Sequence, residues 1–299
     1  MKKLFCKIRE ESGAALVIVA LSITVLMGFT ALTIDGGRMY SAKSNLQKVL
    51  DAAVLAGAQG LRVNESTAIA NALTVASQNG IPIAETDLTI TSSSVKATKE
   101  ISIPLTFARV LGLESSTIGA SAKAVVGHLR RANGIAPIAI EESQVPHGTD
   151  LTCFNTGNNQ GNCGFLALDG TGAPSLETAI RNGSTFDVGN EVTVDTEPGQ
   201  KWGPVSGAIN DLIASDADKP HCQSPDTADY LCNRLIYVVI IDTFADTSGR
   251  GTVNVTGLAA YWIDGFVGKK LTGQFIERVA PGDIGTVTSG TLFGVKLVE

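Results

Sequence analysis

The longest uncharged stretch of the chain lies near its N-terminus, where residues 13–34 read GAALVIVALSITVLMGFTALTI. As an α-helix this run is about 33 Å long, and the hydrocarbon core of a bilayer is about 30 Å thick. The apolar region of a cleaved signal peptide is shorter and ends at a small-x-small site, which Gly28-Phe29-Thr30-Ala31 fits poorly. The pattern therefore predicts an uncleaved transmembrane helix over 13–34, preceded by a cytoplasmic leader over 1–12.

Asp35-Gly36-Gly37 predicts a flexible joint after the apolar run. Beyond it, apolar residues return at steps of three and four residues. Such a stripe lies on one face of a helix. Its members are Met39, Ala42, Leu46, Val49, Ala53 and Ala56. The alanines let the backbone of a packing partner approach closely. That partner is either the chain's own sheet or another subunit, and the second alternative makes the stripe a partner-packing surface for self-association.

The next segment carries start and stop signals of a second helix. Asn64 can act as its N-cap, Gly80 can follow its last turn, and Pro82 prevents its continuation. Three runs of alternating apolar residues then predict half-buried strands. They contain Leu88 and Ile90, Ile101 and Ile103, and positions 118, 120, 122, 124 and 126. A short helical turn between Pro104 and Gly112 separates the last two strands. These elements predict a small α+β module over 35–132.

From residue 133 the chain is β-rich and contains many glycines. The clearest strands are predicted over 235–242, 252–263, 266–275 and 292–298, and short helices over 175–181 and 205–214. The polar segment 128–134 is the expected joint before this part. The predicted fold class is α+β: a single N-terminal transmembrane helix continues into an exported α+β module, and a β-rich extracytoplasmic domain follows over 133–299.

Composition and charge exclude some classes of protein. Only 17 % of the 299 residues are charged and 44 % are hydrophobic, which argues against long disordered stretches. The net charge of -6 argues against a nucleic-acid-binding protein, which needs a basic surface. Residues 141–235 contain fourteen acidic and four basic groups. This acidic segment is either a solvated surface or, alternatively, a calcium site or an electrostatic docking face.

The orientation in the membrane follows from flanking charges and cysteines. Four basic residues precede the apolar run and three follow it within 35–48, which weakly favours a cytoplasmic N-terminus. Cys6 lies before the run. Beyond it lie Cys153, Cys163, Cys222 and Cys232, two pairs with nine residues inside each. Even, locally paired cysteines are typical of an oxidising compartment. We expect a single-pass protein of the cytoplasmic (inner) membrane with its C-terminal domains outside the cytoplasm.

The pairs Cys153–Cys163 and Cys222–Cys232 are the expected disulfides, since each closes a short loop. Sequence alone leaves the crossed pairings open. A zinc site, which His221 beside Cys222 suggests, would prefer two to four residues between its cysteines. Cys6 is expected to stay reduced on the cytoplasmic side.

Motifs of catalysis are missing from the sequence. None of the three histidines forms a HExxH pair, the glycines around Ser206 are off by one position for a GxSxG elbow, and 265–270 lacks the spacing of a phosphate loop. Asp216-Ala217-Asp218 lacks the glycine and the final glutamate of an EF-hand. We therefore expect no enzyme, no catalytic, cofactor-binding or metal-binding residues, no cofactor and no nucleic-acid partner.

Segments of the N-terminal third resemble a known family. Glu11-Ser12-Gly13 enters the apolar run, Asp35-Gly36-Gly37-Arg38 leaves it, and Leu46-Gln47 precedes DAAVLAGA at 51–58. This series is similar to the pattern E-x-G, D-x-G-R, L-Q and D-A-A-x-L-A-G-A of the TadG-like proteins of Flp (tight-adherence) pilus assembly. The resemblance is strong over 9–62 and extends to about 127 through IPLTFARVLG at 103–112.

The resemblance implies a non-enzymatic, bitopic inner-membrane component that builds or anchors an Flp-type pilus, with other pilus or secretion-apparatus proteins as partners. Two departures limit what it implies. The metal-adhesion motif of longer relatives is missing, and Ile18 stands where a prepilin cleavage site has glutamate. Metal-dependent adhesion and prepilin processing are therefore not carried over. The alternative, motivated by the acidic segment, is a membrane-tethered extracytoplasmic binding module for a glycan, calcium or a surface ligand.

Overall fold

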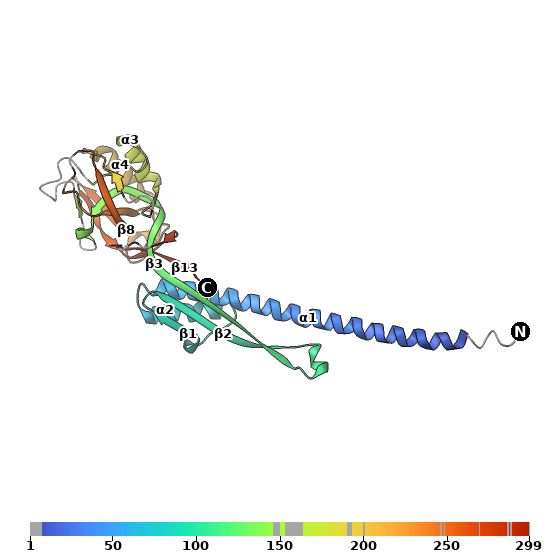
Figure 1. Ribbon diagram of the computed structural model, residues 1–299. Helices are drawn as coiled ribbons and strands as arrows, with labels where there is room; N and C mark the ends of the chain where they lie inside the picture. Colours follow the sequence, from blue (N-terminus) through green and yellow to red (C-terminus); the bar gives the residue numbers. More distant parts are fainter. Residues whose placement is uncertain are drawn as a thin grey trace.

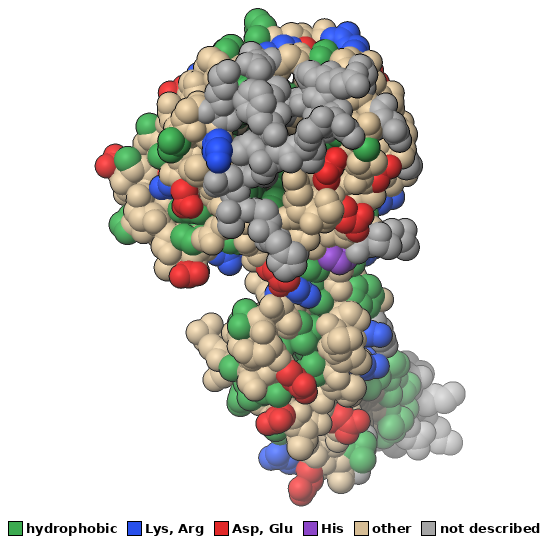
Figure 2. Space-filling view, turned by 90° about the vertical axis from the view of Figure 1, so that its left-hand side faces the viewer, with side chains coloured by type: hydrophobic (Ala, Val, Ile, Leu, Met, Phe, Trp, Pro, Cys, Tyr) green, Lys and Arg blue, Asp and Glu red, His purple; other side chains and the backbone are tan. Residues whose placement is uncertain are grey.

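The computed structural model describes residues 8–145, 150–152, 164–189, 193–199, 201–245, 247, 249–268, 270–285, 287 and 289–298. Helix α1 (Ile8–Gly60) projects from a neck, and the neck carries a head (Figure 1). The neck is formed by residues 35–127 and 294–298, and the head by the described residues of 128–293. Figure 2 shows the neck and the head as two lobes joined by a narrower waist.

Helix α1 runs without interruption through Asp35-Gly36-Gly37, so the predicted joint does not break it. Its first half stands alone in the structure. Every large apolar side chain from Leu16 to Ile34 is between 42 % and 72 % exposed. By length and composition this helix could cross a membrane, and its most apolar stretch has none of its residues buried.

The second half of α1 packs against helix α2 (Glu65–Gln78). As predicted, Asn64 caps α2, and its side-chain oxygen accepts a hydrogen bond from the Thr67 N–H at 2.7 Å. Gly80 follows the helix with a positive φ of 84°. The two helices approach so closely that a Cβ on Gly60 would lie 2.7 Å from the Cα of Ala68. Glycine is therefore required at the end of α1.

One face of an antiparallel sheet covers α1 in the neck. Its strands lie in the order β1 (Leu88–Thr91), β2 (Ser94–Pro104), β3 (Ser115–Glu141) and β13 (Leu292–Leu297). The short helices η1 (Glu85–Asp87) and η2 (Ala108–Leu111) precede β1 and follow β2. The alternating runs predicted as strands thus form this sheet, with the even-numbered residues from 118 to 126 facing inward.

Strand β3 continues from the neck into the head through the expected joint at 128–134. In the neck it pairs with β2 and β13, and in the head with β5 (Ser184–Asp187), β11 (Asp283–Ile284) and β7 (Leu235–Ile241). Strand β13 begins in the core of the head at Leu292, and Val295 and Leu297 pack on the core of the neck. A boundary between 132 and 133 would therefore divide one strand, and the last strand belongs to both lobes.

The head is built on the sheet β3-β7-β8-β9-β4, in which only the pair β3–β7 is parallel. Helices α3 (Ala173–Asn182) and α4 (Trp202–Ala214) contain the two predicted helices and cover one face. Strand β8 (Thr252–Val267) continues through the break that the sequence predicted at 264–265, and the turn to β9 (Lys270–Ile276) begins at Gly268. A register shift between Ile263 and Gly265 absorbs the irregularity without ending the strand.

Short elements and loops cover the other face of the head, around a core that includes Phe186 and Trp262. The remaining elements are η3 (Glu142–Gln144), β4 (Asp150–Thr152), β6 (Thr193–Asp195), η4 (Pro220–Gln223), β10 (Arg278–Val279) and β12 (Ser289–Gly290). The predicted fold class is confirmed: a long apolar N-terminal helix precedes mixed α and β structure with a large sheet.

Candidate functional site: the junction at Asp35

The apolar half of α1 ends at a carboxylate that binds the backbone of a distant loop. Oδ1 of Asp35 accepts a hydrogen bond from the Thr106 N–H at 2.8 Å. Oδ2 accepts from the N–H groups of Phe107 and Ala108, at 2.9 and 2.8 Å. Asp35 is only 5 % exposed, so this is a buried clamp between α1 and the segment that leads into η2.

The clamp satisfies backbone donors that have no partner within η2, as side chains do at helix N-termini. Hydrogen bonds from the backbone, that of Ala108 foremost, hold the pKa of Asp35 below its usual value, although desolvation opposes them. The nearby charge of Arg38 acts in the same direction. Asp35 is therefore ionised at neutral pH, and the clamp weakens only when the pH falls through this lowered pKa.

One turn further along α1, a second side chain holds the same loop. Arg38 Nη1 donates a hydrogen bond to Oγ1 of Thr106. The hairpin of β2 and β3 consequently lies beside α1, with its tip directed toward the N-terminal end of the helix (Figure 1). Between the two clamping residues, a Cβ added to Gly36 or Gly37 would meet no described atom within 4 Å. The contacts among the described residues explain why Asp35 and Arg38 stand at these positions, but they do not explain the two glycines.

Further along α1, Gln47 connects two segments of the same sequence pattern. Its Nε2 donates to Oδ1 of Asp51 at 2.8 Å and to the carbonyl oxygen of Ser121 on β3 at 2.9 Å. Polar contacts thereby hold the helix at two places, at Asp35 to the loop after β2 and at Gln47 to the sheet. The hydrogen bond also explains how a carboxylate at position 51 is tolerated beside an alanine-rich core.

Three of the six residues of the apolar stripe lie in the core of the neck. Leu46, Val49 and Ala53 are at most 3 % exposed and pack against the sheet of the same chain, whereas Met39, Ala42 and Ala56 are half-buried. The sheet of the same chain, the first of the two alternatives, therefore covers Leu46, Val49 and Ala53. Side chains that are buried in this way are not available to another subunit.

The sequence pattern drew attention to the stripe and left the polar residues Asp35, Arg38 and Gln47 without roles. Their partners lie 68 to 74 residues away along the chain. The D-x-G-R segment at the end of the apolar run is the local sequence signal that could have drawn attention to Asp35 and Arg38.

Residues 13–60 match the family model of TadE/G-like Flp pilus-assembly proteins. Over this helix the chain is similar to the TadE/G-like family. The match confirms the resemblance for the N-terminal part, and the TadE/G-like segment contains Asp35, Arg38, Gln47 and Asp51. It supports a membrane-anchored, structural role related to the Flp/Tad pilus and its machinery. No curated protein and no solved structure matches the chain.

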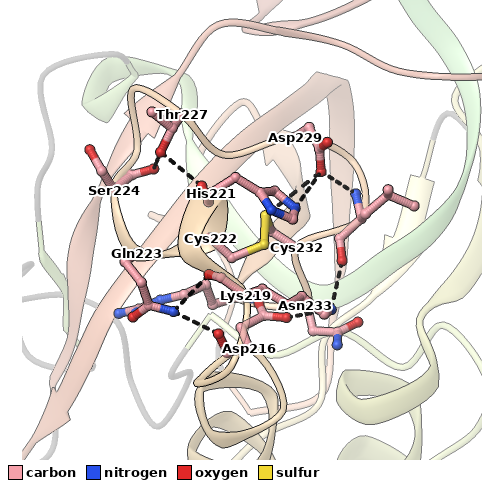
Figure 3. Close-up of a disulfide and its surroundings, with 12 residues drawn as sticks. Asp216, Lys219, His221, Cys222, Gln223, Ser224, Thr227, Asp229, Cys232 and Asn233 are labelled. Atoms are coloured by element: carbon pink, nitrogen blue, oxygen red, sulfur yellow. Dashed lines mark hydrogen bonds and ion pairs between the residues drawn. A yellow bond between two sulfur atoms is a disulfide. The ribbon is translucent and has the colours of Figure 1, made fainter.

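The head lies outside the TadE/G-like segment and contains one of the expected disulfides. Cys222 and Cys232 are bonded, with their Cα atoms 5.4 Å apart and both side chains buried (Figure 3). His221 lies beside them, and these three are the only group of potential metal ligands among the described residues. Because both sulfurs are in the disulfide, they offer no thiolates to zinc. Cys6, Cys153 and Cys163 lie outside the described residues.

The disulfide closes a loop that is also held by polar contacts with Asp216 (Figure 3). Gln223 Nε2 donates to the carbonyl oxygen of Asp216 at 2.6 Å, and the Arg234 N–H donates to its Oδ2 at 2.8 Å. Lys219 Nζ lies 2.7 Å from its Oδ1. Asp216 is completely buried, so its charge has a structural use in joining α4 to β7.

Other carboxylates of the acidic segment also have structural partners. Glu197 is buried, pairs with Lys201, and accepts hydrogen bonds from Arg250 Nη2 and the Gly172 N–H, each at 3.1 Å. Burial, followed by the charge of Arg250, lowers the pKa of Lys201. Figure 2 shows acidic side chains scattered over the visible face rather than gathered in one patch. These contacts give the buried carboxylates of the segment structural roles within the head.

Proposed function

We propose that the protein is a non-enzymatic, single-pass membrane component of Flp/Tad-type pilus assembly or anchoring. In this proposal residues 1–12 are cytoplasmic, 13–34 span the inner membrane, and the neck and head lie outside the cytoplasm. The observation that carries the proposal is the single helix α1, whose exposed apolar half continues without a break into the core of the neck. The family match over 13–60 supports the connection to the pilus.

The mechanism is mechanical. Asp35 and Arg38 fix the neck to α1 where the apolar run ends, so the neck follows the orientation of the spanning helix. Strand β3 then continues into the head. Arg62, just after α1, pairs with Glu277 of the head, and its guanidinium lies 3.7 Å from the centre of the Phe293 ring. These connections orient the head relative to the membrane, as a presenting or anchoring component requires.

The disulfide supports the outward placement of the head, because disulfides persist in oxidising compartments. The topology is tested by protease treatment of cells whose outer envelope has been opened while the cytoplasm stays sealed. We expect digestion of the neck and head and protection of the leader. A protected C-terminus would contradict this topology.

The role in pilus assembly is tested by deleting the protein and imaging surface pili, with the full chain and the Arg62→Ala variant returned separately. We expect loss of pili on deletion, restoration by the full chain, and weaker restoration by the variant. Normal pili in the deletion strain would contradict the proposal. The alternative, a tethered binding module, predicts instead that calcium or a glycan raises the melting temperature of the head.

A further inference from the structure

We propose that the tip of the β2–β3 hairpin is a second membrane-contacting element, whose apolar side chains Phe107 and Leu113 lie among lipid acyl chains beside the spanning helix. This inference rests on the proposed membrane topology and adds a contact to it. In this proposal the membrane anchor consists of the spanning helix and the hairpin tip attached to it.

The first argument is the position of the tip at the outer end of the apolar run, beside a groove that continues along the helix. A groove of about 770 Å³ lies between the hairpin and α1. Phe107 and Ala108 line it on one side, and residues from Ile23 to Asp35 line it on the other. Ile23 precedes Asp35 by twelve residues, about 18 Å along a helix. The groove thus runs along the part of α1 that would occupy the outer leaflet, and it is continuous with the lipid-facing surface.

The second argument is the chemistry of the tip. The side chains of Phe107 and Leu113 are 40 % and 57 % exposed. The helix wall of the groove consists mostly of apolar and small side chains, among them Leu26, Met27 and Leu32. Arg38 follows Asp35 on α1 and Arg109 follows Ala108 in η2, and both are exposed, as basic residues at a lipid headgroup layer commonly are.

The third argument is the satisfaction of the backbone. Unpaired N–H groups are very costly in the hydrocarbon region, where no water can pair with them. The N–H groups of Thr106, Phe107 and Ala108 all donate to Asp35. The clamp therefore does more than hold the loop: it pairs three backbone donors at the outer end of the apolar run, next to the lipid-facing surface.

The chain permits a direct test with tryptophan fluorescence. Its two tryptophans, Trp202 and Trp262, both lie in the head. A tryptophan introduced by Phe107→Trp or Leu113→Trp in the full-length protein reports on the tip. A matched control is Thr98→Trp, at an exposed position of β2 about 20 Å along the strand from Pro104. Each variant is reconstituted in phosphatidylcholine–phosphatidylglycerol vesicles with or without brominated acyl chains, and aqueous iodide is the second quencher.

We expect brominated lipid to quench the tip tryptophans, beyond the signal of the parent protein, and iodide to spare them, with the reverse at Thr98→Trp. Quenching of the tip by iodide but not by brominated lipid would place it in water and overturn the proposal. Protection from both quenchers would indicate a protein occupant, such as a second copy, and would also overturn it. Resistance to alkaline extraction reports separately on the spanning helix, so failure of the tip and failure of the anchor are distinguishable.

Discussion

The cores of the neck and the head are packed with side chains of different size. Among the described residues, seven of the thirteen buried members of the neck core are alanine. The head instead buries large side chains, including Trp262, Tyr261 and Phe186. Small side chains let α1, α2 and the sheet approach closely, so the neck should be sensitive to added volume. The head should be sensitive to lost volume, because its core depends on a few large groups.

The largest expected effect is truncation in the head. Trp262 is 1 % exposed, lies under the guanidinium of Arg234 and donates to Asp264. We expect Trp262→Ala to lower the free energy of unfolding by about 3–5 kcal/mol, in denaturant titrations followed by circular dichroism. Tyr230→Ala, at an exposed position, is the control and should change it by less than about 0.5 kcal/mol. Equal effects of the two variants would contradict the comparison.

Removal of the disulfide should come next. The bond between Cys222 and Cys232 closes a loop with a sequence separation of 10. In the loop-entropy description, losing it costs roughly 3 kcal/mol. We expect the double variant Cys222→Ser, Cys232→Ser to lower the melting temperature of the head, while amide exchange in the neck stays unchanged. Faster amide exchange in α2 of the neck would show that the disulfide stabilises both lobes and would contradict this prediction.

A smaller effect is expected from added volume in the neck. Ala53 is completely buried between α1 and the sheet. Enlarging it by Ala53→Leu should cost about 1–3 kcal/mol through overpacking. Lys48→Ala, on the exposed face of the same helix, should have little effect on thermal melts. If Ala53→Leu melts like the parent, the close packing of the neck is not what stabilises it.

Local signals predicted the local parts of both lobes. The apolar run, the Asn64 cap and the Gly80 stop each depend on residues within a few positions, and the structure has them as predicted. The path of β3 into the head and the dual membership of β13 could not be predicted in this way. Their partners are distant in sequence: Phe293 pairs with His128, and Ile135 with Tyr237.

The candidate site shows the same limit. The sequence identified the segment that matches the TadE/G-like family, because its pattern is contiguous. It left open whether the stripe packs on the chain's own sheet or on another subunit, and Leu46, Val49 and Ala53 are buried by the chain's own sheet. The role of Asp35 depends on backbone donors 71 to 73 residues away, for which no local pattern exists.

The smallest and most local effect is expected at Asp35, where the neck meets the apolar helix. Asp35→Asn keeps the shape of the side chain but replaces one acceptor oxygen by an amide donor, so the clamp loses part of its hydrogen bonds. We expect faster amide exchange at Thr106, Phe107 and Ala108, with little change in the head. In the parent, this protection should persist above the ordinary pKa of aspartate and disappear as the pH falls through the lowered pKa of Asp35.

The matched control for this last change is Asp87→Asn. Asp87 also has a lowered pKa, chiefly because its carboxylate accepts a hydrogen bond from the Ala84 N–H at 2.8 Å. It lies at η1, away from the hairpin tip. Asp87→Asn should therefore accelerate exchange at Ala84 and leave residues 106–108 as they are in the parent. If exchange at 106–108 is the same in Asp35→Asn and the parent, the carboxylate does not hold the hairpin, and the mechanical connection between α1 and the neck would depend on Arg38, Gln47 and the alanine core.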